Sequence, residues 1–202
     1  MNILLINHYA GSDYHGMEFR PYYMGREWAQ MGHNVTILAA DFSHLRKKNP
    51  EVKEDFQEEI IDGITYVWVK TPEYHGNGVG RIKNISTFMF KLRMNYKKIA
   101  DKYKPDAVIA SSTYPLDIYP AHRIAKRSKG KLFFEIHDLW PLTPMEIGGY
   151  SKNNPAIVAL QRAEDFAFKN CDKIISILPN ADKHIRNRRF NTDNYVHVPN
   201  GI

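Results

Sequence analysis

A histidine and an aspartate stand side by side where a buried strand is predicted to end, in the segment KLFFEIHDLWP. An imidazole fixed at that place, His137, could donate a hydrogen bond to a substrate oxygen or exchange a proton near neutral pH. Asp138 could orient a neighbouring group, and Trp140 with Pro141 offers a stiff wall for a sugar ring. A histidine that only closes the strand explains the same positions equally well, so position alone leaves both interpretations open.

A second candidate is the long loop after the first predicted strand, NHYAGSDYHGMEFRP. Gly11 and Gly16 allow the backbone to approach a ligand or to adopt a positive φ, and the loop leads into a helix N-terminus, which favours anions. The loop is longer, more polar and more aromatic than a simple connection needs. It therefore predicts a phosphate- or sugar-binding loop in preference to an ordinary strand-to-helix turn.

Several familiar site patterns are missing from the sequence. Neither a G-x-G-x-x-G nor a G-x-x-x-x-G-K-[ST] pattern occurs, and no H-E-x-x-H, C-x-x-C or His/Asp cluster predicts a metal site. Asp41 follows the second predicted strand, but a solvated loop acid explains it better than a ribose contact. Ser111 and Ser112 lack a nucleophile elbow. Cys171 is expected to be a small buried hydrophobe.

The stretch RIKNISTFMFKLRMNYKKIADKYK predicts a long helix over about residues 81–103. A stripe of apolar side chains with helical spacing should pack on the sheet: Ile85, Phe88, Met89, Leu92, Tyr96, Ile99 and Tyr103. The remaining surface is basic, with Asp101 as its only acid, and Phe90 and Met94 lie in the middle of it.

Two apolar side chains among lysines are typical of an interfacial helix, which inserts shallowly while its basic residues meet anionic headgroups. A lysine-rich solvent face is the plain alternative, and nucleic-acid binding is not expected because no recognition motif accompanies the charge. The predicted membrane-docking residues are Lys83, Phe90, Lys91, Arg93, Met94, Lys97 and Lys98.

The elements that must position these residues alternate along the chain. Strands are predicted over residues 2–7, 34–40, 106–112, 131–138, 172–178 and 195–200, and helices over about 20–32, 81–103, 116–128, 154–170 and 179–188. Asp62 and Gly63, between two β-rich runs, indicate a hairpin. This order predicts an α/β fold: a doubly wound, mainly parallel Rossmann-like sheet with helices on both faces and one inserted β-hairpin.

The composition is that of an ordinary globular protein. The chain has 202 residues, of which 43% are hydrophobic and 25% charged, enough for a sizeable core. The single cysteine excludes an internal disulfide. No run of the sequence approaches the roughly 20 apolar residues of a membrane span. The first predicted strand lacks the basic flank of a signal peptide. A cytoplasmic protein is therefore expected, and the net charge of +6 favours an anionic partner.

Taken in order, these pieces resemble the N-terminal half of a family 4 glycosyltransferase with the two-domain GT-B fold. The matching segments are residues 1–38, the IDGITYVWV hairpin, PDAVIASS, EIHDLWP and the final VPNGI, which together run along nearly the whole chain. The segment HDLWP is similar to that of bacterial enzymes that add amino sugars during O-antigen or capsule assembly.

The resemblance implies roles for particular residues. His137 matches the family's N-domain histidine, which lies near the reacting sugar and hydrogen-bonds to it, and Asp138 beside it completes the predicted catalytic pair. The first loop matches the family's glycine loop near the donor diphosphate and the acceptor, although it departs from the commoner Gly-Gly form. The predicted acceptor- and donor-binding residues are Gly11, His15, Gly16, Glu18, Arg20 and Trp140.

The resemblance also implies a reaction and its partners. A sugar would pass from a nucleotide-sugar, expected to be a UDP-sugar, to a lipid-linked saccharide acceptor, with retention at the anomeric carbon and without an obligatory metal or cofactor. The basic helix corresponds to the surface with which such enzymes dock peripherally on the inner face of the plasma membrane. The product would belong to a cell-surface polysaccharide.

The domain organisation follows from the same resemblance. The family holds the nucleotide-sugar mainly in a C-terminal domain that carries a pair of glutamates. Residues 1–202 are therefore predicted to be a single acceptor-side domain without that donor domain, inactive when alone, and residues 199–201 to begin the crossing between domains. Two rival classes stay open: a standalone sugar- or nucleotide-binding module, and a dinucleotide-dependent oxidoreductase or epimerase. The second is disfavoured because the glycine fingerprint and a Tyr-x-x-x-Lys pair are missing.

Overall fold

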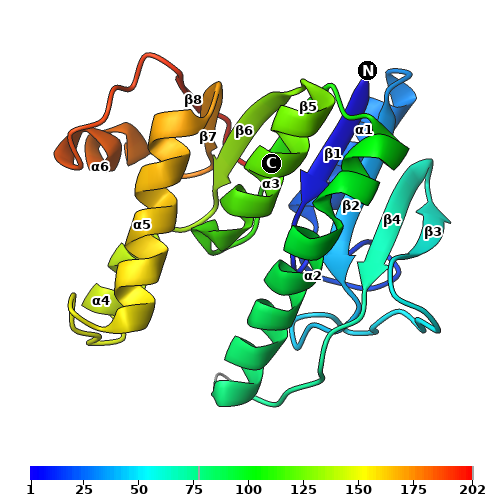
Figure 1. The fold of residues 1–202 in the computed structure, drawn as a ribbon, viewed down its shortest axis with the longest axis horizontal. Helices are drawn as coiled ribbons and strands as arrows, with labels where there is room; N and C mark the ends of the chain where they lie inside the picture. The colour runs from blue at the N-terminus through cyan, green and yellow to red at the C-terminus, as the bar shows by residue number, and fades with distance from the viewer. Residues whose placement is uncertain (77, 202) are drawn as a thin grey trace.

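The computed structural model describes residues 1–76 and 78–201, and in that part of the chain eight strands form one sheet (Figure 1). Their order across the sheet is β3-β4-β2-β1-β5-β6-β7-β8, and every neighbouring pair is parallel except β3 with β4. The strands are β1 (Asn2–Ile6), β2 (Asn34–Ala40), β3 (Gln57–Ile61), β4 (Ile64–Val69), β5 (Ala107–Ala110), β6 (Lys131–Ile136), β7 (Lys173–Ser176) and β8 (Tyr195–His197).

The helices follow the predicted order. They are α1 (Arg20–Gln30), α2 (Val79–Tyr103), α3 (Ile118–Ser128) with the short 3₁₀ turn Pro115–Asp117 before it, α4 (Leu142–Glu146), α5 (Pro155–Asn170) and α6 (Ala181–Asn187). The predicted doubly wound α/β fold is confirmed. The one unexpected helix is α4, which lies in a segment predicted to be a loop, because five residues are too few to show a helical repeat.

The inserted hairpin joins β3 to β4, as predicted. Asp62 and Gly63 both have positive φ, 49° and 80°, which is the conformation that a tight two-residue hairpin turn requires. The prediction did not assign β4 to the parallel sheet, yet β4 pairs with β2 from Val35–Ile64 to Ala40–Val69. The hairpin therefore extends the sheet by a parallel strand and closes its edge with the antiparallel β3.

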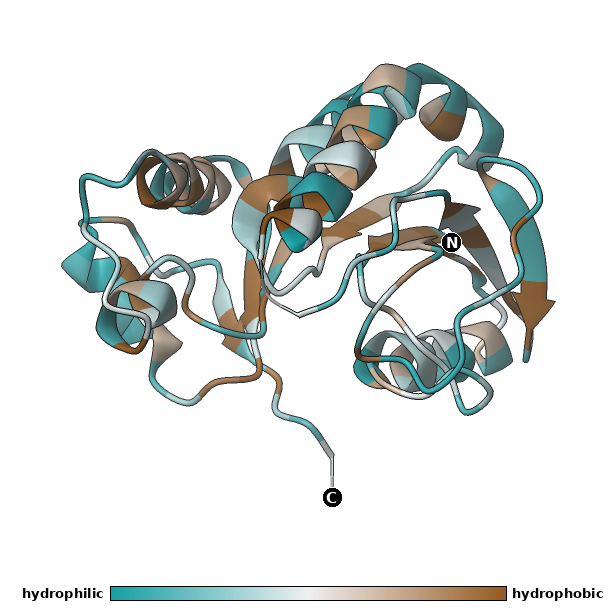
Figure 2. Cartoon of the chain, turned by 90° about the horizontal axis from the view of Figure 1, so that it is seen from below, coloured by the Kyte–Doolittle hydropathy of each residue, from teal (hydrophilic) through white to brown (hydrophobic). Residues whose placement is uncertain are grey.

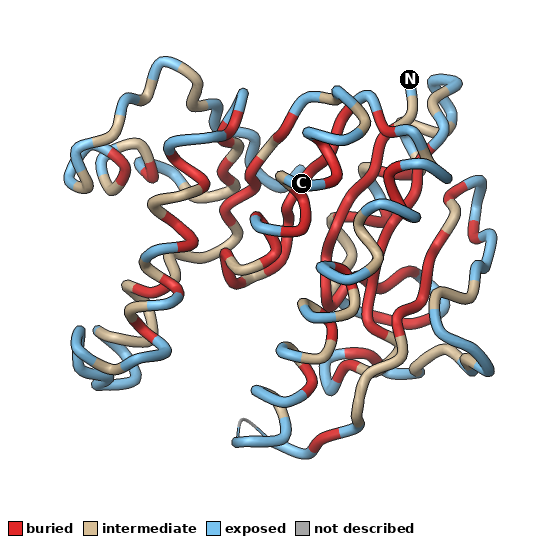
Figure 3. Tube along the Cα trace, viewed as in Figure 1, coloured by how far each residue is buried: buried red, intermediate tan, exposed pale blue. Residues whose placement is uncertain are grey.

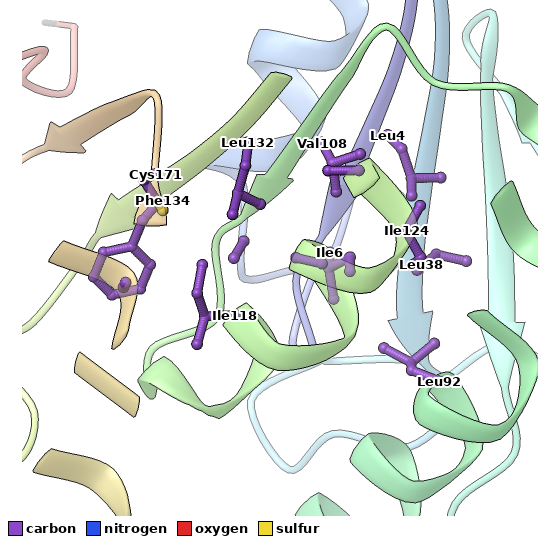
Figure 4. Close-up of a cluster of buried hydrophobic side chains, with 14 of the residues drawn as sticks. Leu4, Ile6, Leu38, Leu92, Val108, Ile118, Ile124, Leu132, Phe134 and Cys171 are labelled. Carbon is purple, nitrogen blue, oxygen red and sulfur yellow. The ribbon is translucent and has the colours of Figure 1, made fainter. Parts of the chain in front are cut away.

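One face of the sheet packs against α2, α3 and α5. Because side chains alternate along a strand, Leu4, Val108 and Leu132 point to this face, where they meet Leu92 of α2 and Ile124 of α3 (Figure 4). Viewed from below, the strands carry most of the hydrophobic residues and the connections are largely hydrophilic (Figure 2). Side chains of this kind contribute roughly 1.5–3 kcal/mol each when they leave water.

The other face packs against α1, which lies over β2 and β4. Tyr22 of α1 contacts a second buried cluster that includes Ile37 and Tyr66. Gly25 allows this close approach, because a Cβ there would lie 3.1 Å from the side chain of Ile64. Further along the same face, Phe133 is only half-buried.

The carboxyl ends of the strands lie at one edge, and two segments project beyond it (Figure 1). One is the N-terminal half of α2 and the other is α4 with the start of α5. Figure 3 shows that buried residues concentrate along the strands, whereas residues 146–153 and the first turn of α2 are exposed. The predicted packed stripe of α2 is confirmed, with Phe88 and Leu92 fully buried and Ile99 3% exposed.

Candidate active site

Four polar side chains from three elements meet at the carboxyl ends of β5 and β6. Glu135 and His137 are two residues apart and so point to the same face, which is the face that carries α1. The Nε2 atom of His137 lies 3.1 Å from Oε2 of Glu135 and 2.9 Å from Oγ of Ser111. Ser111 also donates to Glu135 Oε2 at 2.7 Å, and Arg20 pairs with Glu135 Oε1 at 2.9 Å.

Glu135 is the centre of this group, and its role was not predicted. Its side chain is 2% exposed. Burial alone would raise its pKa, but the hydrogen bond and charge of His137, the charge of Arg20 and the hydroxyl of Ser111 outweigh burial and lower the pKa to about 2. The carboxylate is therefore ionised at neutral pH. One signal could have revealed it, because an acid inside an apolar strand needs a buried partner.

The hydrogen bonds also set the tautomer of His137. An ionised carboxylate only accepts, so in the uncharged form of the ring the proton lies on Nε2 and Nδ1 carries the lone pair. Within residues 1–76 and 78–201, Nδ1 has no hydrogen-bond partner, and the His137 side chain is 8% exposed. The ring is thus held from one side and can offer an acceptor atom on the other.

Asp138 organises its own loop. Its Oδ1 accepts from the Leu139 amide at 2.8 Å and from the Thr143 hydroxyl at 2.7 Å, and its Oδ2 accepts from the Trp140 indole at 3.0 Å. Asp138 therefore orients Trp140, which was one of the roles foreseen for it. A catalytic role for Asp138 itself stays a prediction. Trp140 packs at the border of a cluster built around Tyr9 and does not stand free as a wall.

The first loop folds back on itself. The Gly11 amide donates to the Glu18 carbonyl at 2.9 Å, and Ser12 forms an isolated bridge with Gly16. A Cβ at Gly11 would lie 1.7 Å from the Gly16 carbonyl oxygen, and Gly16 has a φ of 86°. The loop's own backbone therefore requires glycine at both positions. From the sequence, these glycines were expected to let the backbone approach a ligand.

Two further residues of this loop, His15 and Glu18, differ in burial and in hydrogen bonding. His15 is 5% exposed, its Nδ1 lies 2.8 Å from the Ser12 hydroxyl, and its ring meets Trp68 edge-on at 5.2 Å. It therefore points into the protein and not toward a ligand, and burial lowers its pKa. Glu18 is half-buried, and among the described residues its carboxylate has no hydrogen-bond partner, which leaves it available to a hydroxyl.

Arg20 is fully engaged inside the protein. Its guanidinium donates twice to Glu135, at 3.0 and 2.9 Å, and it also donates to the Val198 carbonyl at 3.0 Å, the Pro199 carbonyl at 3.4 Å and Asn200 Oδ1 at 2.9 Å. A guanidinium has five N–H groups, so all are used. In this arrangement Arg20 joins the site to the segment after β8, and a direct contact with a diphosphate is not supported.

Most of the predicted docking residues share one side of α2. Phe90 and Met94 are 62% and 63% exposed, and Val79, which was not predicted, is 81% exposed. At 100° per residue Val79 lies in line with Phe90. These side chains form the outward face of α2: Val79, Ile82, Lys83, Phe90, Arg93, Met94, Lys97 and Lys98.

Lys91 was predicted to belong to this face and does not. Its ammonium lies 2.7 Å from Asp55 and donates to the Lys70 carbonyl at 2.8 Å. Lys91 therefore ties α2 to the segment before β3 and to the end of β4. The sequence could not indicate this, because Asp55 lies in a polar segment that shows no regular pattern.

Other acids and nucleophiles near this edge serve the fold. Asp41 was expected to be a solvated loop acid, but it accepts from the amide and the hydroxyl of Thr71 and so joins the ends of β2 and β4. Cys171 is a free thiol, 8% exposed, in the cluster between the sheet and the helices α2, α3 and α5, as predicted, and burial raises its pKa. Within the described chain, no three His, Cys, Asp or Glu side chains form a group that could hold a metal ion.

Asp117 is fully buried beside the site. One carboxylate oxygen accepts from the Ser112 amide at 2.8 Å, and the other has no partner among the described residues. Burial raises its pKa to about 7 against weaker opposing contributions from the Ser112 hydrogen bonds and from His137.

We expect Asp117→Asn to make stability less dependent on pH. The folded protein holds the Asp117 proton more tightly than the unfolded chain, so this contribution is complete below about pH 3.8 and is lost as pH rises through about 7. The shift corresponds to roughly 4 kcal/mol. Urea unfolding at pH 5 and pH 8 measures the part of this contribution that is lost between those values, roughly 3 kcal/mol. The wild type should lose more stability than the variant between these pH values, and the exposed Asp193→Asn is the control. Equal losses in wild type and Asp117→Asn would contradict the prediction.

With this geometry in place, the chain can be compared with known proteins. Residues 14–202 match the model described as Glycosyltransferase Family 4. The chain belongs to glycosyltransferase family 4. The resemblance seen in the sequence, to the N-terminal domain of a family 4 enzyme with the GT-B fold, is thereby confirmed. A comparison with curated proteins gives no match.

Solved structures with the same fold include the following three proteins. A sucrose-phosphate synthase from Thermosynechococcus elongatus aligns with a TM-score of 0.58 and 14% identity, over 98% of this chain and 88% of that one. HepE of Anabaena, in complex with UDP and glucose, gives 0.55 and 10%, over 100% and 45%. The UDP-GlcNAc 2-epimerase of Methanocaldococcus jannaschii gives 0.52 and 12%, over 98% and 45%.

These likenesses establish the fold and nothing finer. One of the three is an epimerase, so the fold does not separate sugar transfer from epimerisation, whereas the family match does. The family 4 chain spans about half the length of HepE and of the epimerase. Among residues 1–76 and 78–201, no helix combines the length and apolarity needed to cross a bilayer.

Proposed function

We propose that this family 4 chain is the acceptor-side domain of a retaining glycosyltransferase that moves a sugar from a UDP-sugar to a saccharide acceptor. The observation that carries the proposal is the ring of His137, held at the carboxyl edge of the sheet by Glu135 and Ser111. Ligands of open α/β sheets bind at that edge. The UDP and glucose bound by HepE support the donor class.

In this proposal His137 acts by binding and orienting a sugar. Its Nδ1 accepts a hydrogen bond from a sugar hydroxyl, while Nε2–H remains committed to Glu135. The half-buried carboxylate of Glu18 accepts from a hydroxyl of the acceptor, and Trp140, oriented by Asp138, borders the sugar site. Hydrogen bonds that are stronger in the transition state than in the bound substrate accelerate transfer.

The proposal includes a division of labour between two domains. Residues 1–202 supply the acceptor side, a second domain supplies most donor contacts, and residues 199–201 begin the crossing. No guanidinium N–H of Arg20 is left for a diphosphate among the described residues, which supports donor binding elsewhere.

We expect residues 1–202 alone to bind UDP-glucose and UDP-N-acetylglucosamine weakly and to turn neither over. Isothermal titration measures binding, and mass spectrometry of a saccharide acceptor measures transfer, with the intact protein as the positive control. Tight binding together with turnover by the isolated chain would contradict the division of labour. Failure of the intact protein to transfer sugar from any of a full panel of nucleotide-sugars would overturn the proposed function itself.

We further propose that the acceptor is lipid-linked and that the outward face of α2 docks on the inner, anionic surface of the plasma membrane. Phe90 and Met94, more than half exposed among four basic side chains, support this choice. Val79 and Ile82 extend the apolar part of the face toward the end of α2 that projects beyond the sheet (Figure 1). The membrane would then lie beside the site, where a lipid-linked saccharide can reach it. Such enzymes build cell-surface polysaccharides, including lipopolysaccharide and capsule.

A further inference from the structure

Both carboxylate oxygens of Glu135 have hydrogen-bond partners, and these partners come from separate parts of the chain. Arg20, at the start of α1, approaches Oε1, while Ser111, after β5, and His137, after β6, approach Oε2. Removing two charges from water is costly, and a buried pair often stabilises a protein no more than apolar residues would. A role in orienting His137 would explain why the chain keeps such a pair at this edge.

We infer that Glu135 is a positioning residue that fixes the ring of His137, and that Arg20 couples this pair to residues 198–200. The effect of Glu135 on turnover rests on the proposed function, whereas its effect on the orientation of the His137 ring does not.

The first half of the inference follows from hydrogen-bond chemistry. A carboxylate at 3.1 Å from Nε2 selects the Nε2–H tautomer because it cannot donate. The Ser111 hydroxyl, at 2.9 Å from the same nitrogen, restricts rotation of the ring. With both partners in place, Nδ1 is kept as the acceptor that faces away from Glu135. An amide at position 135 could donate to Nε2 and so favour the opposite tautomer.

The second half follows from how Arg20 divides its donors. Two N–H groups bind Glu135 Oε1, and three bind the carbonyls of Val198 and Pro199 and the side chain of Asn200. The guanidinium is planar and rigid, so a movement of the acceptors in residues 198–200 rotates the whole group and disturbs its hydrogen bonds to Glu135. A displacement of residues 198–200 should therefore change the position of the Glu135 carboxylate. Because Oε2 binds Nε2 of His137, the orientation of that ring should change as well. Figure 2 shows the chain extending away from the body of the molecule as it nears its C-terminal end.

The decisive experiment reads the tautomer directly by ¹⁵N NMR of the histidine rings in the 202-residue chain. At a pH high enough for the ring to be uncharged, the wild-type His137 resonances should report protonated Nε2 and unprotonated Nδ1. Glu135→Gln should shift them toward the Nδ1–H tautomer or to an averaged mixture, and Glu135→Asp, which keeps the charge but withdraws it by one methylene, should shift them less. If Gln reduces folding, the Asp variant gives the test. His137 resonances unchanged in the folded variants would overturn the inference whatever the protein's function.

The chain offers a matched control in a second buried Glu–His pair. Glu164 and His184 lie 2.9 Å apart, and Glu164 is 3% exposed. Glu164→Gln should change the resonances of His184 and leave those of His137 as in the wild type. A change at His137 in this variant would mean that its ring responds to general loss of stability, which would contradict specific positioning by Glu135.

The coupling through Arg20 is tested by Arg20→Lys, which keeps the charge and loses the fork. The backbone amide of Asn200 and the ring of His137 should both shift, whereas Arg127→Lys, in the exposed pair with Asp101, should move neither. A shift at Asn200 with His137 unchanged would refute the coupling.

Kinetics of the intact enzyme separate this inference from the proposed function. Glu135→Gln should lower kcat at least tenfold with little change in KM, because the ring is present but misoriented, and Glu164→Gln should stay within about twofold of wild type. A changed tautomer with unchanged kcat would leave the positioning role intact and refute a catalytic role for His137. An unchanged tautomer with lowered kcat would refute the positioning role.

Discussion

Replacing His137 by alanine in the intact enzyme should lower kcat by about 10²–10³-fold, since one preorganised hydrogen-bonding group that acts in the transition state contributes about that much. The change removes Nδ1, the acceptor atom that His137 offers to a sugar, and it leaves the buried carboxylate of Glu135 with Ser111 and Arg20 as partners. KM for the donor should change little if most donor contacts lie in the other domain. Initial rates over a range of donor concentrations measure both parameters.

The control for this prediction is His75→Ala, because His75 is exposed in the loop before α2 and should not affect turnover. Thermal unfolding of both variants separates a lost function from a lost fold. Near-normal kcat in a folded His137→Ala enzyme would contradict a role of His137 in turnover and would leave it only a structural role at the end of β6. His137→Gln should retain part of the rate, because the amide oxygen can accept a hydrogen bond in place of Nδ1.

The fold could be predicted from the sequence because its signals are local. The strand β2 reads as a continuous apolar run, and Asp62 with Gly63 marks a turn whose positive φ values few other residue pairs adopt. The packed stripe of α2 followed from its spacing in the same way. The helix α4 was missed because it is only one turn and a half long, which no repeat can reveal.

The site was predicted less completely because its contacts are remote in sequence. His137 was found because it ends a strand, but Arg20 reaches Glu135 across 115 positions and Asn200 across 180, and no local pattern reports such pairs. His15 illustrates the opposite error. Its polar neighbours suggested an open ligand loop, whereas the loop folds its imidazole against Trp68.

Reversing the four basic charges on the outward face of α2 should abolish binding to anionic vesicles. The variant changes to glutamate Lys83, Arg93, Lys97 and Lys98. Each basic residue near an anionic surface contributes about 1 kcal/mol, so their loss alone removes roughly 4 kcal/mol, close to a 10³-fold change in partitioning. Lys91 is left unchanged because it binds Asp55, and its replacement would disturb the packing of α2.

Sedimentation with phosphatidylcholine vesicles that contain phosphatidylglycerol measures this binding, and phosphatidylcholine alone gives the baseline. A control with the same change in net charge replaces exposed lysines elsewhere: Lys53, Lys126, Lys169 and Lys173. The control variant should lose much less binding than the α2 variant, because distant charges are screened beyond about 10 Å in 0.1 M salt. Equal losses in both variants would mean that net charge, and not this face, attracts the chain.

The apolar side chains of the face make a separate contribution that salt does not screen. Phe90→Ser with Met94→Ser removes two side chains that are 62% and 63% exposed, so the change should leave the stability of the fold nearly unaffected. Binding should weaken at low and high salt alike, whereas the charge reversal acts mainly at low salt. If the serine variant binds vesicles as the wild type does, α2 touches the headgroups without inserting, and the interfacial-helix proposal is wrong even though the electrostatic attraction remains.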